Sequence, residues 1–150
     1  MGYGLRDGDL HRDCEPGEVI VREGDTSREM YVIEHGRVQI EKRAGDDRVV
    51  LASLEKGDFF GEIALLGGGP RDATAVAVVP TRLLVIQAGG LLLRFRRDPT
   101  FAFEMVHKLS RRVSALNEKV VGLLEDRPEA SDGVAQLLSF GPDRRLKDPT

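Results

Sequence analysis

Residues 60–74 read FGEIALLGGGPRDAT, and this stretch decides how the fold and the function of the whole sequence are interpreted. Glu62 opens a short apolar run and Arg71 follows a glycine tract, so a carboxylate and a guanidinium come from the two ends of one loop. Amides at the start of a helical turn favour an anion such as phosphate, and arginine adds a planar fork of donors with a permanent charge. Glu62 can accept hydrogen bonds from hydroxyl groups of the same ligand. The stretch therefore predicts a site for a small anionic ligand.

The same stretch closely resembles the phosphate-binding cassette of the cyclic-nucleotide-binding family, and we refer to residues 60–74 as the cassette. Glycine, acid, small residue, proline, arginine, small residue and threonine all fall at the offsets expected for that family. The upstream segments PGEVIVREGD, YVIEHGRVQI and LEKGDFFGEIAL also resemble its strand and turn signatures. The resemblance extends over roughly residues 14–124 and implies a jelly-roll β-barrel that binds a cyclic mononucleotide.

The resemblance also assigns roles to individual residues. Glu62 matches the acid that accepts the ribose 2′-hydroxyl, and Arg71 matches the arginine that pairs with the cyclic phosphate. Ile40 and Leu51 match positions on the base side of the pocket, although both can equally be core residues. Asn117 precedes a Glu-Lys pair that resembles a base-reading helix segment, and its alternative is a solvated helix position. The candidate ligand-binding residues are Gly61, Glu62, Ile63, Ala64, Arg71, Asp72, Ala73, Ile40, Leu51 and Asn117.

Asp72 departs from the family pattern, which places a small neutral residue beside the phosphate. A carboxylate close to a phosphate is unfavourable by about 1 kcal/mol at 4 Å in water. Asp72 either turns outward and leaves only its amide at the site, or pairs with Arg71 and weakens binding, or accepts from a guanine and shifts selection from cAMP towards cGMP. The first interpretation is favoured.

The order of strand and turn signals predicts the fold class. Apolar residues alternate with polar ones before the cassette, turn signals recur about every ten residues, and residues 44–47 have the composition of a hairpin loop. Such a pattern is typical of an all-β sandwich or barrel. We predict a mainly β fold with C-terminal helices: a jelly-roll barrel over residues 16–98, preceded by a loosely held arm at residues 1–15.

Two helices are predicted after the barrel. Residues 89–97 form a short helix candidate, and a long helix over 99–124 begins at Asp98-Pro99, an N-cap followed by proline at the first helical position. Its apolar residues recur with heptad spacing, which indicates a homodimer through this helix, or else a face packed on the helix's own barrel. The seam consists of Ala102, Val106, Leu109, Val113, Leu116, Val120 and Leu123. The tail, residues 125–150, is expected to be mobile or to dock through its apolar patch.

Composition excludes several classes of function. The formal net charge of −3 does not suggest a nucleic-acid-binding protein, and the tail is too short for a helix-turn-helix domain, so no DNA binding is expected from this chain. The single cysteine, Cys14, rules out an internal disulfide and fits a reducing compartment. The apolar runs are far shorter than the ~18 residues that a membrane-spanning helix needs, so we expect a cytoplasmic location without membrane attachment. The three histidines lack metal-ligand spacing, and no nucleophile, base and orienting group occur together. We therefore expect no enzyme activity, no metal and no cofactor besides the ligand.

These observations predict a cyclic-nucleotide-binding regulatory protein that senses cAMP, or less favourably cGMP, and transmits a conformational change to an unidentified effector protein. One alternative is a scaffold that keeps the fold and the dimer helix but no longer binds ligand. Another is a fragment of a transcription regulator of the catabolite activator class.

Overall fold

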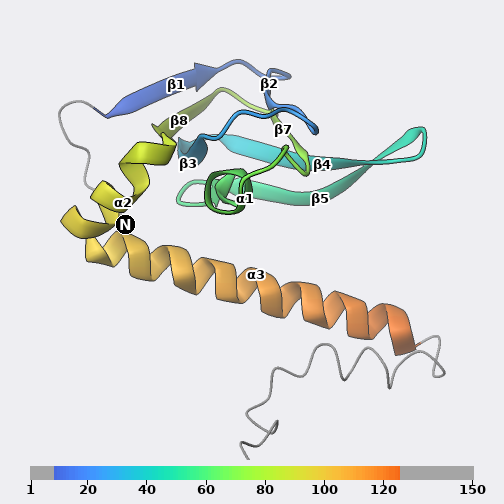
Figure 1. Ribbon diagram of the computed structural model, residues 1–150. Helices are drawn as coiled ribbons and strands as arrows, with labels where there is room; N and C mark the ends of the chain where they lie inside the picture. Colours follow the sequence, from blue (N-terminus) through green and yellow to red (C-terminus); the bar gives the residue numbers. More distant parts are fainter. Residues whose placement is uncertain (1–8, 126–150) are drawn as a thin grey trace, which may run out of the picture. The chain divides into compact units, whose positions relative to one another are not determined.

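The structure is a computed structural model that describes residues 9–125 (Figure 1). The chain divides into two compact units, one ending at Pro99 and the other beginning at Thr100. The first unit contains every strand together with helices α1 and α2, and the second contains helix α3 from its second residue onward. Each unit is described separately.

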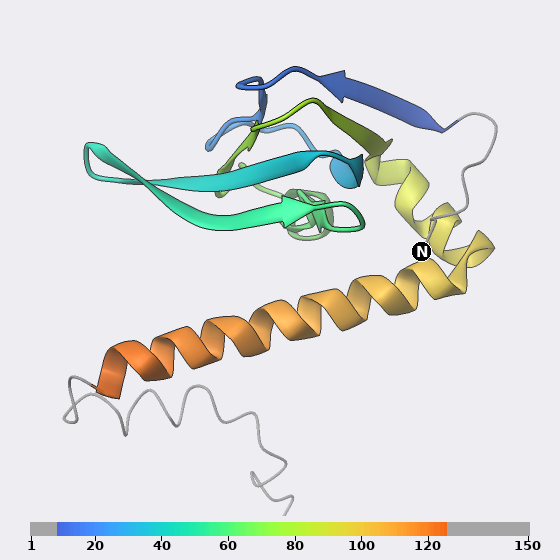
Figure 2. The same cartoon turned by 180° about the vertical axis from the view of Figure 1, so that it is seen from behind.

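The first unit is built from two four-stranded sheets. One sheet has the order β1-β8-β3-β6 and the other has the order β2-β7-β4-β5, and all pairings are antiparallel. Figure 2 shows the long β4–β5 hairpin on one side and strands β1 and β8 on the other. The strands are β1 (Leu10–Cys14), β2 (Val19–Val21), β3 (Met30–His35), β4 (Arg37–Ala44), β5 (Asp47–Glu55), β6 (Phe59–Phe60), β7 (Thr74–Ala77) and β8 (Thr81–Ile86). The predicted β-barrel class is confirmed.

Successive residues of a strand point to opposite faces of its sheet. Each sheet therefore has one inward face, and the side chains of the two inward faces form the core. Val38 pairs with Ala77 in one sheet, Ile33 pairs with Leu83 in the other, and all four side chains are buried in the same cluster. The predicted hairpin at residues 44–47 is also present, since β4 and β5 are joined by a two-residue connection.

The N-terminal boundary of the barrel differs from the prediction. Residues 10–14, expected to belong to a loose arm, form β1 and pair with β8 from Leu10–Val85 to Cys14–Thr81. Within β1 only Cys14 is buried, and Leu10 is 51% exposed. The strand is therefore held mainly by its backbone pairing with β8. Such pairing does not require alternating apolar side chains, so the sequence carries no strand signal here.

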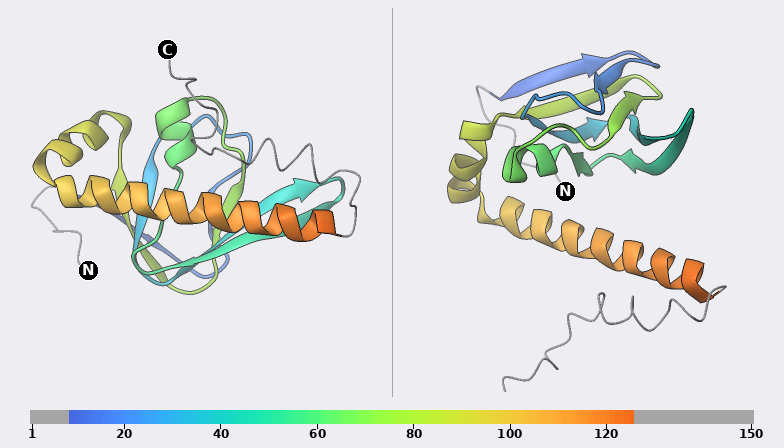
Figure 3. Two further views of the ribbon diagram at one scale, coloured as in Figure 1. Left: turned by 90° about the horizontal axis from the view of Figure 1, so that it is seen from below. Right: turned by 45° about the vertical axis from the view of Figure 1, so that its right-hand side comes forward.

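Three helices are present in the described part of the chain: α1 (Glu62–Gly67), α2 (Ala88–Arg97) and α3 (Pro99–Glu125). The predicted helices at 89–97 and 99–124 are confirmed within one residue at each end. Helix α3 has 27 residues, and Figure 3 shows it as one unbroken helix. None of the three helices is both long enough and apolar enough to cross a membrane. The first residues of the predicted arm and the predicted tail from residue 126 lie outside the described residues.

Candidate ligand-binding site

The cassette starts from a fixed strand and turns sharply into α1. Phe60 pairs with Tyr31 of β3, and their rings stack with centroids 5.1 Å apart. Gly61 follows with φ of 88°, a left-handed conformation that glycine adopts without the steric cost other residues incur. Helix α1 begins at Glu62 without a hydrogen bond from a capping side chain. Its first amides therefore have no side-chain cap and point towards the start of the cassette.

Gly61 also gives the backbone room to pass close to Arg71. A Cβ atom at this position would lie 2.9 Å from Nη1 of Arg71 and 2.9 Å from the carbonyl oxygen of Glu29. Such distances are shorter than real Cβ contacts, so either the arginine or the strand would have to shift. Glycine lets the cassette fold around the guanidinium without such a shift.

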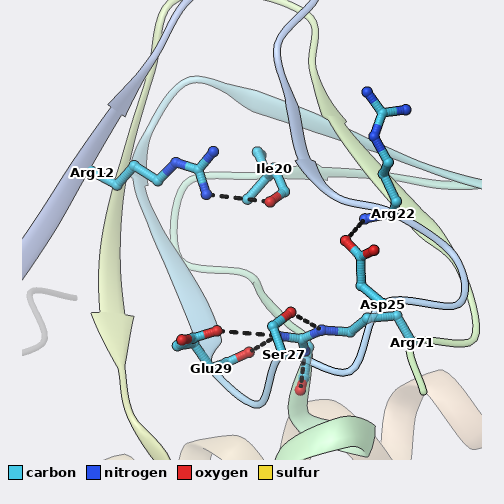
Figure 4. Close-up of polar contacts among 8 residues, drawn as sticks. Arg12, Ile20, Arg22, Asp25, Ser27, Glu29 and Arg71 are labelled. Carbon is cyan, nitrogen blue, oxygen red and sulfur yellow. Dashed lines mark hydrogen bonds and ion pairs between the residues drawn. The ribbon is translucent and has the colours of Figure 1, made fainter.

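Arg71 is buried, with 4% of its surface exposed, and its guanidinium is held by neutral groups (Figure 4). Nε donates to Oγ of Ser27 at 3.2 Å, and Nη1 donates to the carbonyl of Gly61 at 3.0 Å. Nη2 donates to the carbonyl of Glu29 at 2.6 Å. The backbone of Arg71 is also paired, to Asp25 and Gly24 of the same β2–β3 connection. Residues 24–29 thus wrap around a single arginine side chain.

One carboxylate faces this guanidinium. Oε2 of Glu29 lies 3.6 Å from Nη2 of Arg71, and the glutamate side chain is 38% exposed whereas that of Arg71 is 3% exposed. Burial raises the pKa of the neighbouring Tyr31 hydroxyl, and the negative charge of Glu29 adds to this shift. Sequence reasoning missed Ser27 and Glu29. A serine and an acid in a polar loop carry no signal of a partner more than 40 residues away.

Glu62 is the second charged residue that the cassette buries. The described part of the chain buries only three polar or charged residues, and these are Glu62, Arg71 and Thr81. Charged side chains are seldom buried, so two of them in one short loop mark the cassette as a candidate functional site. Glu62 also lies in the first turn of α1, where the helix dipole favours a carboxylate.

The other predicted ligand-binding residues of the cassette differ in how far their side chains are exposed. Ala64 is buried and Ala73 is half-buried, whereas Ile63 is 56% exposed. Asp72 is exposed, and the carboxylate that pairs with Arg71 belongs to Glu29. This arrangement favours the outward interpretation of Asp72.

The two predicted base-side residues occupy different environments. Ile40 pairs with Ala52 and Ala75 and packs against the core cluster. Leu51 lies at a register shift, because Ile40 pairs with Ala52 while the next residue of β4 pairs with Val50. Leu51 therefore occupies a β-bulge, and it is 46% exposed. Asn117 lies on α3 in the second unit, and its role stays a prediction.

The described residues contain no group of three or more His, Cys, Asp or Glu side chains arranged to hold a metal ion. The chemistry available in the cassette is therefore that of a guanidinium, a carboxylate and backbone amides. These groups are chemically suited to an anion with neighbouring hydroxyls.

Residues 11–98, more than half of the chain, match the model of the protein family described as "Cyclic nucleotide-binding domain". The chain belongs to this family. The resemblance inferred from the cassette is thereby confirmed, and the matched residues include the whole cassette.

Several proteins that are similar to this chain are longer than it. The chain is 36% identical over 128 residues to the cyclic AMP receptor protein of Thermus thermophilus, covering 83% of this chain and 59% of the receptor. It is 44% identical over 67 residues to the acetyltransferase Pat of Mycolicibacterium smegmatis, covering 45% of this chain and 20% of that protein. The crystal structure of the Thermus thermophilus catabolite activator protein matches with a TM-score of 0.69 at 30% identity, covering 81% of this chain and 61% of that one. The chain thus spans less than two thirds of each of these proteins.

Proposed function

We propose that this cyclic nucleotide-binding domain is a regulatory module, not an enzyme, and that it senses cAMP in preference to cGMP. The observation that carries the proposal is the buried pair of charged groups in the cassette, Glu62 and Arg71, held around the left-handed turn at Gly61. An arginine has five N–H donors, and three of those of Arg71 are used by neutral groups of the protein. The remaining two suit the oxygens of a phosphodiester.

The sugar and the phosphate would be held from both ends of the cassette. Glu62 accepts from the ribose 2′-hydroxyl, while the amides of Glu62, Ala64 and Asp72 donate to the phosphate. Ile40 covers part of the base. The exposed position of Asp72 supports the outward interpretation of this residue, and the receptor relative is named for cyclic AMP.

Transmission of the signal would begin at α1. Ile63 and Leu66 of this six-residue helix are 56% and 59% exposed, whereas Leu65 is buried. When the phosphate draws α1 towards Arg71 at the other end of the cassette, these apolar residues change their surroundings and repack. A ligand can shift such an equilibrium only through contacts that differ between the two arrangements. The recipient is a partner chain, or the second copy in a homodimer formed through residues 99–124.

Calorimetric titration of purified protein with cAMP and cGMP tests this function. We expect saturable binding with tighter affinity for cAMP. Arg71→Lys should weaken binding by roughly tenfold or more, because lysine keeps the charge but lacks the planar fork of donors. The absence of heat from either nucleotide, with a folded protein, would instead favour the alternative of a scaffold without ligand.

A further inference from the structure

Glu29 contacts Arg71 in two different ways. Its backbone carbonyl accepts from Nη2 at 2.6 Å, and its carboxylate oxygen Oε2 lies 3.6 Å from the same nitrogen. The first contact would persist with any residue at position 29, whereas the second depends on the glutamate side chain. Figure 4 shows the carboxylate of Glu29 directed towards the guanidinium.

This carboxylate differs from every other group that holds the guanidinium. The other partners are the hydroxyl of Ser27 and the carbonyls of Gly61 and Glu29, which are all neutral. Among the partners of this guanidinium within residues 9–125, only the Glu29 side chain brings a compensating negative charge, and the guanidinium is 3% exposed. It is also the partner best able to leave, because it is 38% exposed and water can solvate it after it separates.

We propose that Glu29 is an internal competitor for Arg71 and sets the affinity of the cassette for its ligand. The inference rests on the proposed function, in which Arg71 pairs with the phosphate of a cyclic nucleotide. A cyclic phosphodiester and a carboxylate each carry one negative charge. When the phosphodiester replaces the Glu29 carboxylate beside Arg71, the charge compensation of Arg71 changes little. The ligand gains the full attraction of the guanidinium only when the carboxylate is absent.

The test compares two glutamates of the same β2–β3 connection, at positions 29 and 23. Glu29→Gln removes the charge beside Arg71 and keeps both the side-chain length and the backbone carbonyl. Glu23→Gln removes one charge from an exposed side chain whose partner is the backbone amide of Arg43, and its amide oxygen can still accept. The control therefore reports the effect of net charge alone.

Calorimetric titration with cAMP at about 0.15 M salt, a concentration that screens distant charges, gives the readout for the three proteins. We expect Glu29→Gln to bind roughly two- to tenfold more tightly than the wild type, and Glu23→Gln to stay within about twofold of it. Urea unfolding of each protein checks that the variants are folded.

Each result has a definite meaning. A wild type that binds nothing, together with a Glu29→Gln variant that binds cAMP, supports the competitor in its strongest form. If the wild type binds and Glu29→Gln binds equally or more weakly, the competitor role is overturned and the proposed function stands. If the folded wild type and the folded Glu29→Gln variant both fail to bind cAMP and cGMP, the proposed function fails and the inference fails with it.

Discussion

At the scale of single residues, Gly61 and Arg71 depend on each other. The left-handed turn at Gly61 lets its carbonyl accept from Nη1 at 3.0 Å, and the missing Cβ leaves the space through which the guanidinium passes. Arg71 in turn donates to three acceptors of the protein: the hydroxyl of Ser27 and the carbonyls of Gly61 and Glu29. The cassette is thus a structural centre as well as a candidate site, and substitutions there should affect both stability and binding.

Gly61→Ala should lower the free energy of unfolding by about 2 kcal/mol, since the new Cβ combines an unfavourable φ with a close contact. Urea unfolding followed by circular dichroism measures the loss. Gly67→Ala is the control, because Gly67 is the last residue of α1, the helix that Gly61 precedes, and has no atom within 4 Å of its added Cβ. Equal effects of the two substitutions would contradict the packing argument.

Cys14 provides a prediction about pH. Burial, followed by the hydrogen bond and charge of Glu18, raises the pKa of its thiol from 9.0 to about 11. Because the thiol keeps its proton to higher pH in the folded chain, its stabilising contribution is complete below pH 9 and is lost as the pH rises towards 11. Urea unfolding at pH 8 and pH 10.5 should show a larger loss of stability for the wild type than for Cys14→Ala. Identical pH dependence in the two proteins would show that the thiol does not contribute.

At the scale of elements, α3 carries the predicted heptad seam on exposed positions. Four of the seven seam residues are at least half exposed, namely Val106, Val113, Leu116 and Leu123. An apolar stripe of this kind is stabilised when a second helix covers it, and heptad spacing favours a left-handed pair of helices. This exposure supports the proposed homodimer.

Leu116→Glu should convert the homodimer into a monomer, or raise its dissociation constant at least about tenfold, because a dimer would bury an unpaired charge at the seam. Sedimentation equilibrium of the whole chain measures the change. Ser114→Glu introduces the same charge at an exposed position of α3 outside the seam and should leave the dimer intact. A wild type that sediments as a monomer at micromolar concentration would overturn the dimer.

At the scale of the whole molecule, the cassette joins the two sheets of the first unit. It begins at β6, in the sheet β1-β8-β3-β6, and it ends at β7, in the sheet β2-β7-β4-β5. Arg71 adds a second link by bonding to the β2–β3 connection, whose two strands also belong to different sheets. A ligand bound by the cassette would therefore stabilise both sheets together.

Cyclic AMP at a hundredfold excess over its dissociation constant should add about 2.7 kcal/mol to the free energy of unfolding, because it binds only the folded chain. For a protein of this size, the melting temperature should rise by roughly 5 to 10 °C. Differential scanning calorimetry measures the shift. The same concentration of 5′-AMP, which has the base but not the cyclic phosphate, should shift the melting temperature much less; an equal shift would argue against recognition of the cyclic phosphate.

The amino-acid sequence by itself determined the features that depend on local pattern. Turn residues and alternating apolar positions predicted the β-barrel, Asp98-Pro99 predicted the start of α3, and the spacing within the cassette identified the family. These features are encoded by neighbouring residues, because backbone conformation and side-chain period depend on a few positions at a time.

Only the tertiary structure decided what lies beside those residues. Edge pairing with β8 made a strand of residues 10–14, a register shift placed Leu51 in a bulge, and the fold of the β2–β3 connection brought Ser27 and Glu29 to Arg71. The physical reason is common to all three: strand register and loop closure bring together residues that are dozens of positions apart, and local periodicity carries no record of those partners. The family and its cassette could therefore be identified from the sequence, whereas the Glu29 carboxylate beside Arg71 emerged only from the folded chain.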